Sequence, residues 1–324
     1  MNKLITVALP IIKTEFLHDA ISSVLNQTFK DFEFVIYNNA INSKKDEILK
    51  IVCEFDDERI KYFENNNHKS IIEDWNLCIQ KATGKYFVLF SDDDTYDSNF
   101  LEEIIFLIKK YSRINLFHSK IRKINPDSKV ILEGPKLPEY ESGIEFIWKR
   151  LINDRPQFAP DFICKTEKLR SIGGFFNLPL AWGSDDITWF LLAAEYGVAS
   201  TNKTNCNWRV STYNISSTGN VEDRIQAVNQ YKKWLLNYLK NVSPTNNQDM
   251  IYINQISNKI DKIFSDKKIY LLIHNSKRVN LFRFAIDTIM FRKKYNLDNM
   301  VLVKLIFIKA KMIFNSLISK HFIL

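Results

Sequence analysis

The chain has 324 residues, of which 46% are apolar and 25% are charged, so it can bury a substantial core and does not have the composition of a disordered protein. Its formal net charge of +8 comes from one end, because residues 267–324 hold 12 Lys/Arg against two Asp, whereas residues 1–266 hold 33 basic and 35 acidic residues. Residues 1–266 contain no basic stripe interleaved with aromatic residues, which excludes nucleic acid as the expected partner.

The cysteines and the N-terminal segment indicate a cytoplasmic protein. The four cysteines are far apart and form no C-x-x-C pair: Cys53, Cys78, Cys164 and Cys206. This spacing is not that of a disulfide scaffold and favours a reducing compartment. The apolar segment 1–12 is short, contains Pro10 and has no small-residue cleavage site, so we expect a first β-strand there rather than a signal peptide.

Strand-like and helix-like patterns alternate over the first 110 residues. Strands are expected at 4–11, 32–37, 60–63 and 86–90. Apolar residues recur at helical spacing over 16–25, 48–55, 71–82 and from about Asn99 to 111, where Glu102 is placed for a capping box. The alternation predicts an α/β fold with a mostly parallel sheet and helices on its faces.

The remainder of the chain is less regular. A turn at 125–128 predicts a hairpin, and 134–184 is rich in Gly, Pro and aromatic residues without a clear period. Helical periodicity returns at 186–196 and again from about 222, with a break near 243–247. We therefore expect one α/β domain over 1–220, with halves 1–110 and 111–220, and a helical, basic extension over 221–324.

The most distinctive motif is an apolar strand, 86–90, followed by Ser91 and three acidic residues, Asp92, Asp93 and Asp94. The strand delivers these carboxylates to the carboxyl edge of the sheet, where open α/β folds bind ligands. Adjacent carboxylates repel one another unless a cation compensates, and Mg²⁺ or Mn²⁺ bridging to phosphate is a natural compensator. The alternative interpretation is a turn whose acidic side chains cap the next helix.

Five segments together resemble a known family. They are Val7-Ala-Leu-Pro10, the stretch 20–29, the stretch 31–36, Ala82-Thr-Gly-Lys-Tyr86 and Ser91-Asp-Asp-Asp94. In this order and spacing they resemble the nucleotide-binding half of the family 2 GT-A glycosyltransferases, closely over 3–110 and more loosely over 160–217. The resemblance implies a GT-A fold, Rossmann-like with a mostly parallel sheet flanked by helices. It also implies inverting transfer of a sugar from a nucleotide to a hydroxyl group, as in bacterial surface-polysaccharide synthesis.

The resemblance assigns roles in donor binding. Asp93 is implied as a ligand of Mn²⁺ or Mg²⁺, Asp94 as a second ligand or a brace, and Asp92 as a ribose contact. Further donor contacts are implied at Pro10, Thr14, Glu15, Asn38, Asp74, Asn76, Gly174 and Arg209. Asn38 departs from the usual Asp, which leaves the base open although a uridine nucleotide is expected, and Ser211 stands where relatives often have a His. No histidine metal ligand is therefore predicted.

Some of these positions have a purely structural alternative. Gly174 follows Gly173 and lets backbone approach the donor sugar closely, or simply forms a turn. Arg209 offers a planar fork to a diphosphate or forms a surface ion pair. Trp75 fits the apolar stripe of its helix, so we expect it to pack in the core.

A second acidic motif, Asp185-Asp186, precedes a helix that ends near Gly197. By the resemblance, Asp186 is the catalytic base, with Asp185 as the other candidate, because inverting transfer needs a carboxylate within reach of the acceptor hydroxyl. The neighbouring Trp182 is expected to form a wall for the acceptor sugar. The alternative is that Ser184 or one of the two acidic residues only caps the helix.

The C-terminal segment 277–320 has the pattern of basic helices with apolar faces. Lys304, Lys309 and Lys311 interrupt the apolar run, so it is a poor transmembrane span but a suitable interfacial helix. We expect a cytoplasmic enzyme peripheral to the inner membrane, acting on a glycan acceptor that is lipid-linked. Packing against the catalytic domain and a dimer interface are the alternatives.

Two other classes of protein fit less well. A metal-dependent nucleotidyltransferase or a Rossmann dehydrogenase needs a Gly-rich phosphate loop after the first strand, and Pro10-Ile-Ile-Lys-Thr14 contains no Gly. A non-enzymatic membrane adaptor would account for the basic tail but not for two acidic motifs at the ends of expected elements. The glycosyltransferase is therefore the main hypothesis.

Overall fold

The computed structural model describes most of the chain, in two compact units. The described residues are 3–40, 43–65, 70–210, 220–275, 283–284, 286, 289–290, 292 and 303–310. The first unit comprises 1–177, 183–217 and 244–253, and the second comprises 178–182, 218–243 and 254–324. Since these units interleave along the sequence, the expected domain boundary after residue 220 stays a prediction.

A ten-stranded sheet forms the centre of the first unit, as far as it is described, in the order β3-β2-β1-β4-β9-β6-β10-β5. Two short strands lie off this path, β7 beside β6 and β8 beside β10. The strands are β1 (Ile5–Ile11), β2 (Phe32–Asn38), β3 (Ile60–Glu64), β4 (Tyr86–Leu89), β5 (Thr95–Tyr96), β6 (Leu116–Ile124), β7 (Val130–Glu133), β8 (Tyr140–Glu141), β9 (Phe162–Lys165) and β10 (Val198–Arg209).

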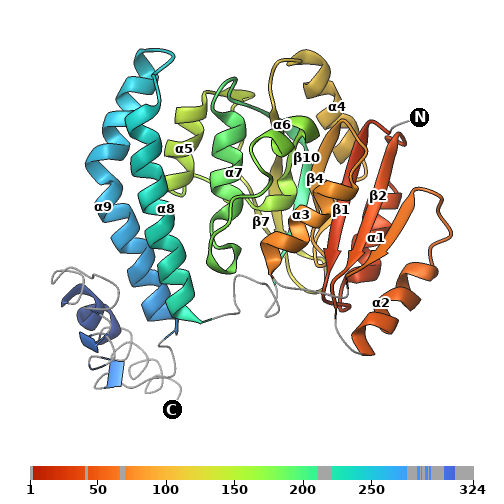
Figure 1. Ribbon diagram of the computed structural model, residues 1–324, viewed down its shortest axis with the longest axis horizontal. Coiled ribbons are helices and arrows are strands. Elements are labelled where there is room, and N and C mark those ends of the chain that lie inside the picture. Colours follow the sequence, from red (N-terminus) through yellow and green to blue (C-terminus); the bar gives the residue numbers. More distant parts are fainter. Residues whose placement is uncertain are drawn as a thin grey trace. The chain divides into compact units, whose positions relative to one another are not determined.

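The N-terminal half of the sheet is parallel, which confirms the predicted α/β fold. β1 pairs in parallel with both β2 and β4, and β2 pairs in parallel with β3 (Figure 1). The crossovers are α1 (Leu17–Leu25), α2 (Ser43–Cys53) and α3 (Ile71–Lys81). β2 and β4 are buried along their whole length, as expected for strands covered on both faces. The carboxyl ends of β1, β2 and β4 therefore lie at one edge of the sheet.

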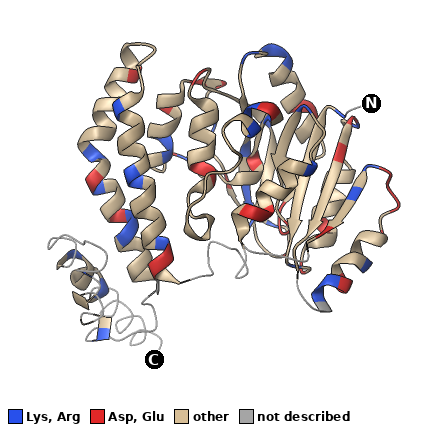
Figure 2. Cartoon of the chain, in the orientation of Figure 1, with Lys and Arg blue, Asp and Glu red and all other residues tan. Residues whose placement is uncertain are grey.

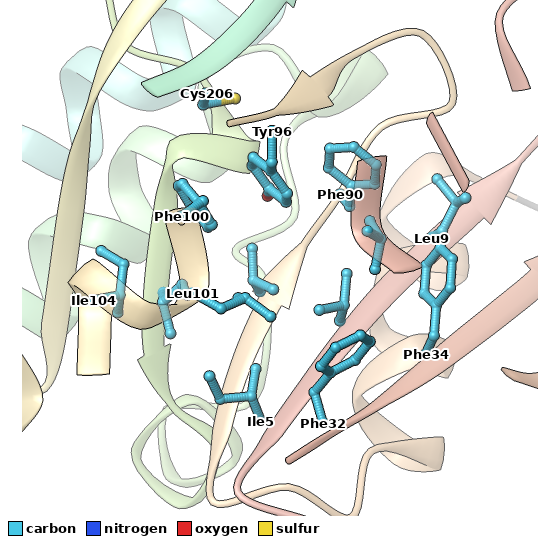
Figure 3. Packing of buried hydrophobic residues seen from close by; sticks show 14 of the residues in the cluster. Ile5, Leu9, Phe32, Phe34, Phe90, Tyr96, Phe100, Leu101, Ile104 and Cys206 are labelled. Atoms are coloured by element: carbon cyan, nitrogen blue, oxygen red, sulfur yellow. The ribbon is translucent and has the colours of Figure 1, made fainter. Parts of the chain in front are cut away.

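An aromatic stack fixes the loop that follows β4. The ring centroids of Phe90 and Tyr96 lie 4.4 Å apart and those of Tyr96 and Phe100 lie 3.8 Å apart, in a core that also holds Leu9 (Figure 3). The Tyr96 hydroxyl donates to the Pro160 carbonyl at 2.6 Å. Because these rings stand on both sides of residues 91–94, the acidic segment is held at both of its ends.

The region 134–184, predicted to be irregular, is in fact partly ordered. It contains α5 (Gly143–Leu151), η1 (Ala159–Asp161), β9, α6 (Thr166–Ser171) and η2 (Pro179–Ala181). β9 lies antiparallel between β4 and β6, and β6 pairs in parallel with β10. The predicted hairpin at 125–128 is confirmed, because β6 and β7 are antiparallel and the Ser128 amide donates to the Asn125 carbonyl at 3.0 Å.

The predicted capping box of α4 (Phe100–Lys110) is wrong. Asn99 occupies the N-cap position but its side chain makes no capping hydrogen bond, and its Nδ2 instead donates to the Lys203 carbonyl at 3.2 Å. Glu102 accepts from the Thr28 hydroxyl at 2.9 Å. Contacts with distant segments have replaced the local cap.

The described residues of the second unit are mostly helical. α8 (Val221–Asn241) runs beside α9 (Asn247–Asn275), with the Tyr231 and Phe264 rings 5.3 Å apart and Lys232 Nζ 2.5 Å from Asp261 Oδ1. The predicted break near 243–247 is confirmed between these helices. Basic and acidic residues are interspersed on both helices (Figure 2). No helix in the described part of the chain is long and apolar enough to cross a membrane.

Candidate active site

Asp92 ties the end of β4 to the loop that follows β1. Its carboxylate is buried, and Oδ2 accepts the backbone amides of Ile12 at 3.0 Å and Lys13 at 2.9 Å. Burial raises the pKa of Asp92, and the positive charge of Lys13 opposes that rise. The loop that carries Thr14 and Glu15 is thus fixed against the acidic segment, as adjacent carboxyl ends of parallel strands predict.

Lys13 is the cation of this segment, and the sequence analysis did not identify it. Its Nζ lies 2.7 Å from Asp93 Oδ2 and 3.2 Å from Asp92 Oδ1, and its side chain is only 13% exposed. Ser91 donates to the other oxygen of Asp93 at 2.6 Å. Burial alone would lower the pKa of Lys13, but the two carboxylates outweigh burial and raise it. Its place two residues after the end of an expected strand was the available signal.

Asp94 faces the last long strand of the sheet. Its Oδ1 accepts the backbone amide of Arg209 at 2.8 Å, and Arg209 Nε donates to the Asp93 carbonyl at 2.8 Å. Burial, followed by the charge of Asp93, raises the pKa of Asp94 well above its usual range. The three carboxylates are bonded to other segments and not to α4, so the interpretation that they cap the next helix is wrong.

Arg209 is fully buried and bonds several segments to one another. Its guanidinium lies 4.4 Å from the ring centre of Phe16 and 3.4 Å from Asp19 Oδ2. It also donates to the carbonyls of Asn125 and Pro126 at 3.3 and 2.9 Å, and to the Ser128 hydroxyl at 3.0 Å. These partners are protein groups of the same unit, so the implied contact of Arg209 with a diphosphate stays a prediction.

The acidic segment does not present a ready-made metal site. No cluster of three or more His, Cys, Asp or Glu among the described residues could hold a metal ion. All four carboxylate oxygens of Asp92 and Asp93 have protein partners, and the Lys13 ammonium lies on both residues. A divalent cation with one or two carboxylates and phosphate oxygens as ligands would require the Lys13 ammonium to move.

Asn38, at the end of β2, uses its amide within the protein. Nδ2 donates to the Tyr62 hydroxyl at 2.7 Å and to the Lys45 carbonyl at 3.1 Å, and Oδ1 accepts the Ala40 amide at 3.1 Å. The side chain is completely buried. A contact of Asn38 with the base stays a prediction, and the geometry gives its polar atoms a structural role.

A second polar cluster lies beside it. Asn65 Nδ2 donates to Asn39 Oδ1 at 3.0 Å and to Asp74 Oδ1 at 3.1 Å. Asn39 and Asp74 are buried, and Pro10 pairs in register with Tyr37 on the neighbouring strand. The structure therefore brings Asp74 to the same edge as Pro10. Asn39 and Asn65 were not predicted as site residues, although each lies two residues after the end of an expected strand.

The double glycine joins α3 to the segment before α7 (Ser184–Ala193). Gly173 and Gly174 have φ of +88° and +84°. A Cβ on Gly174 would overlap Asn76 Oδ1, which accepts the Phe175 amide at 2.9 Å. Gly174 thus permits a close approach of the Asn76 side chain, and its implied contact with the donor sugar stays a prediction. Trp75 is half-buried and packs edge-on against the buried Phe175, with ring centroids 5.1 Å apart.

The acidic pair lies in the first turn of α7. The N-cap is Gly183, with φ of 85° and no side-chain capping bond, so the interpretation that Ser184, Asp185 or Asp186 is the cap is wrong. Arg150 Nε donates to Asp186 Oδ1 at 2.6 Å, and Asp186 is buried. Asp185 is half-buried, and burial followed by the charge of Asp186 raises its pKa to about 7. Arg150 was not identified from the sequence because α5 was not predicted.

Two further expectations are not decided. Trp182 belongs to the second unit, where the Arg224 guanidinium lies 5.1 Å from its ring centre. Its role as a wall for the acceptor sugar stays a prediction. Ser211 lies outside the described residues.

Comparison with known proteins gives the family. Residues 7–165 match the model of glycosyl transferase family 2. Residues 7–165 belong to this family, and the chain is a glycosyltransferase. This glycosyltransferase is similar to an uncharacterized glycosyltransferase of Haemophilus influenzae, with 23% identity over 93% of this chain and 95% of the relative. It is also 24% identical, over 66% of its length and 78% of the relative, to the UDP-Glc:alpha-D-GlcNAc-diphosphoundecaprenol beta-1,3-glucosyltransferase WfgD of Escherichia coli.

A solved structure of the same fold agrees with this assignment. The mannosyltransferase PcManGT of Pyrobaculum calidifontis, in complex with GDP-Man and Mn²⁺, superposes with a TM-score of 0.59 and 12% identity over 94% of this glycosyltransferase and 86% of that chain. The likeness confirms the predicted GT-A fold.

Proposed function

We propose that the protein transfers a sugar from a nucleoside diphosphate, a UDP-sugar, to a hydroxyl group of a glycan acceptor with inversion. The observation that carries the proposal is the carboxyl edge of the sheet, where Asp92 bonds to the loop after β1 and the buried Asp93 and Asp94 follow β4. This edge is where open α/β sheets bind ligands. Carboxylates repel a diphosphate unless a cation lies between them, so Lys13 or a metal ion would supply the positive charge that binding requires.

The acceptor side of the proposal rests on Asp186. Arg150 orients its carboxylate at the start of α7, as a third group orients a catalytic base. In the reaction the acceptor oxygen bonds to the anomeric carbon, the bond from that carbon to the diphosphate breaks, and the acceptor proton passes to Asp186.

Metal dependence is also part of the proposal. Asp93 and Asp94 would hold Mn²⁺ or Mg²⁺ together with oxygens of the donor diphosphate, and the cation would neutralise charge on the leaving group. The complex of PcManGT with GDP-Man and Mn²⁺ supports this. Lys13 must leave Asp93 for such a cation to bind.

The similarity to WfgD supports a lipid-linked acceptor of the diphospholipid type. The tail adds an observation, since Val303 and Phe307 are 70% and 69% exposed while Leu305 and Lys309 of the same helix are buried. An exposed apolar face of this kind suits the surface of an anionic membrane. We expect the protein to be peripheral to the inner face of the membrane.

Vesicle sedimentation tests the membrane part of the proposal. The protein should sediment with vesicles that contain anionic phospholipid and less with neutral vesicles. Phe307→Glu should reduce sedimentation, and Met250→Glu, a matched change at another exposed apolar residue, should not. Equal sedimentation of Phe307→Glu and the wild type would remove this surface from the proposal.

A thermal-shift panel tests the main proposal. UDP-sugars and GDP-sugars are compared with and without Mn²⁺, using the wild type, Asp93→Asn and the exposed-carboxylate control Asp56→Asn. A bound ligand stabilises the folded state by an amount set by its concentration and dissociation constant. The wild type and Asp56→Asn should respond to one nucleotide class, and Asp93→Asn should respond less. The proposal fails if no nucleotide-sugar stabilises the wild type, or if Asp93→Asn responds equally.

A further inference from the structure

The ammonium group of Lys13 contacts the carboxylates that a metal ion bound to the acidic segment would use. It bridges Asp92 Oδ1 and Asp93 Oδ2 at 3.2 and 2.7 Å. The side chains of Lys13, Asp92 and Asp93 are 13%, 5% and 9% exposed. The ammonium therefore neutralises part of the charge of the two carboxylates at a place with little access to bulk water. The backbone amides of Ile12 and Lys13 also donate to Asp92. These bonds fix the backbone of Lys13 beside the acidic segment.

We propose that Lys13 is a built-in cation of the donor site: its ammonium competes with a divalent cation for Asp93, and transfer of Lys13 to the donor diphosphate relieves this competition. This inference rests on the proposed function for the identity of the donor. The position of Lys13 on the acidic segment does not depend on it.

Competition between the two cations follows from the geometry. A metal ion binds carboxylate oxygens at about 2.0–2.2 Å. An ammonium 2.7 Å from Asp93 Oδ2 would then lie within a few ångströms of that ion, and like charges repel strongly where water is largely excluded. Ser91 occupies the other oxygen of Asp93 at 2.6 Å, so the ion has no free oxygen of Asp93 to choose instead.

The donor supplies the group to which Lys13 can transfer. Lysine is a compact point charge on a flexible four-carbon stem and is a common partner of phosphate. Lys13 stands in the loop between β1 and α1, next to Thr14, at the edge where the donor is expected. When the diphosphate draws the ammonium away, Asp93 becomes available to the metal ion. Nucleotide and metal therefore bind cooperatively, and Lys13 carries part of that coupling.

Direct measurement of Mn²⁺ binding in the absence of nucleotide tests the competition. Electron paramagnetic resonance counts free Mn²⁺ in titrations of the wild type, Lys13→Met, Lys13→Gln and Lys13→Arg. The two neutral variants should bind Mn²⁺ about tenfold more tightly than the wild type, because a repulsive charge is removed. Lys13→Arg keeps the charge and should behave as the wild type.

Equal or weaker Mn²⁺ binding by both neutral variants would overturn the inference, as would tightening by Lys13→Arg to the same extent. Circular dichroism establishes that each variant is folded, and the two neutral variants guard against the failure of either one. This measurement involves no donor and no turnover.

Calorimetry with a nucleoside diphosphate in the presence of a chelator tests the transfer to phosphate. Metal-free binding should weaken by about tenfold in Lys13→Met and remain in Lys13→Arg, since a charged hydrogen-bond partner of the diphosphate is lost. Unchanged binding by Lys13→Met would overturn this step. If no protein binds the nucleotide while the neutral variants still bind Mn²⁺ more tightly, the proposed function fails and the competition at Asp93 stands.

Discussion

The two acidic regions of the first unit use the same residue type in opposite ways. After β4, Asp92 and Asp93 have a protein partner at every carboxylate oxygen, and Lys13 neutralises part of their charge. At the start of α7, Asp186 is paired with Arg150 while the half-buried Asp185 has a pKa raised to about 7. The first arrangement suits binding of a charged ligand and the second suits proton transfer near neutral pH.

The largest expected effect tests the acceptor side. Asp186→Asn should lower the transfer rate by about 10²–10⁴-fold, the usual contribution of a general base, and leave donor binding unchanged. Single-turnover kinetics and calorimetry separate these two quantities. If Asp186→Asn retains normal turnover and Asp185→Asn loses it, the base is Asp185 and the assigned roles are exchanged.

Substitution of Arg209 tests how much the hydrogen bonds of this buried side chain contribute to the stability of the donor side. Arg209→Met removes the partner of three backbone carbonyls and a hydroxyl, so it should lower the free energy of unfolding by about 3 kcal/mol. Urea denaturation measures the loss. Asp19→Asn, which removes only the exposed partner of Arg209, should cost less than about 1 kcal/mol. Equal losses would show that the ion pair, rather than the carbonyl contacts, matters.

Gly173 and Gly174 provide a matched pair of substitutions at neighbouring positions. Gly173→Ala and Gly174→Ala both place a side chain at positive φ, which costs on the order of 1–3 kcal/mol. Only the Cβ at Gly174 meets Asn76, since nothing lies within 4 Å of a Cβ at Gly173. Gly174→Ala should therefore be the more destabilising variant in urea denaturation. Equal costs would mean that Asn76 moves aside freely.

The smallest expected effect concerns Asp185 and pH. Because its folded-state pKa is raised from the usual 3.8 to about 7, the protonated form is favoured by folding. This contribution to stability is fully present below about pH 3.8 and is lost as pH rises from there through about 7. Asp185→Asn should therefore raise the unfolding temperature by about 2–4 °C at pH 8 and by clearly less at pH 5.

The same residue should affect the pH profile of transfer. In the wild type the rate should rise with pH through about 7 as Asp185 ionises and adds negative charge where the acceptor proton is taken up, and the inflection should disappear in Asp185→Asn. A profile that keeps this inflection in the variant would assign it to another group. A stability gain of equal size at both pH values would contradict the raised pKa.

The parallel half of the fold could be predicted because each of its elements carries its own pattern. β1, β2 and β4 are apolar runs at the expected positions, and the helices between them show helical spacing. β9 and β10 could not be predicted in the same way. β9 has four residues and pairs with strands distant in sequence, and β10 contains the polar run Ser200–Asn205, so tertiary pairing rather than local pattern determines them.

The candidate site shows the same difference between features that are visible in the local sequence and features that depend on tertiary contacts. Asp92, Asp93 and Asp94 were identified because a strand end and an acidic run are visible in the sequence. Their partners were not, since Lys13 and Arg209 are 80 and 115 residues away from the carboxylates that they bond. Similarly, Arg150 stands 36 residues from Asp186 on a helix that showed no clear period. Spacing in sequence carries no information about such long-range bonds.

The bond between Asp94 and the backbone of Arg209 makes the site late to assemble during synthesis. A nascent chain that has reached residue 110 already contains all three acidic residues. The Arg209 amide that donates to Asp94 Oδ1 has not yet been synthesised. Until β10 pairs with β6, the Asp94 carboxylate lacks the Arg209 amide as a donor. Burying the carboxylate without this donor would cost free energy, so hydration by water is favoured. A fragment that ends before residue 209 lacks this bond, and we expect it to pack less tightly around the acidic segment than the complete first unit does.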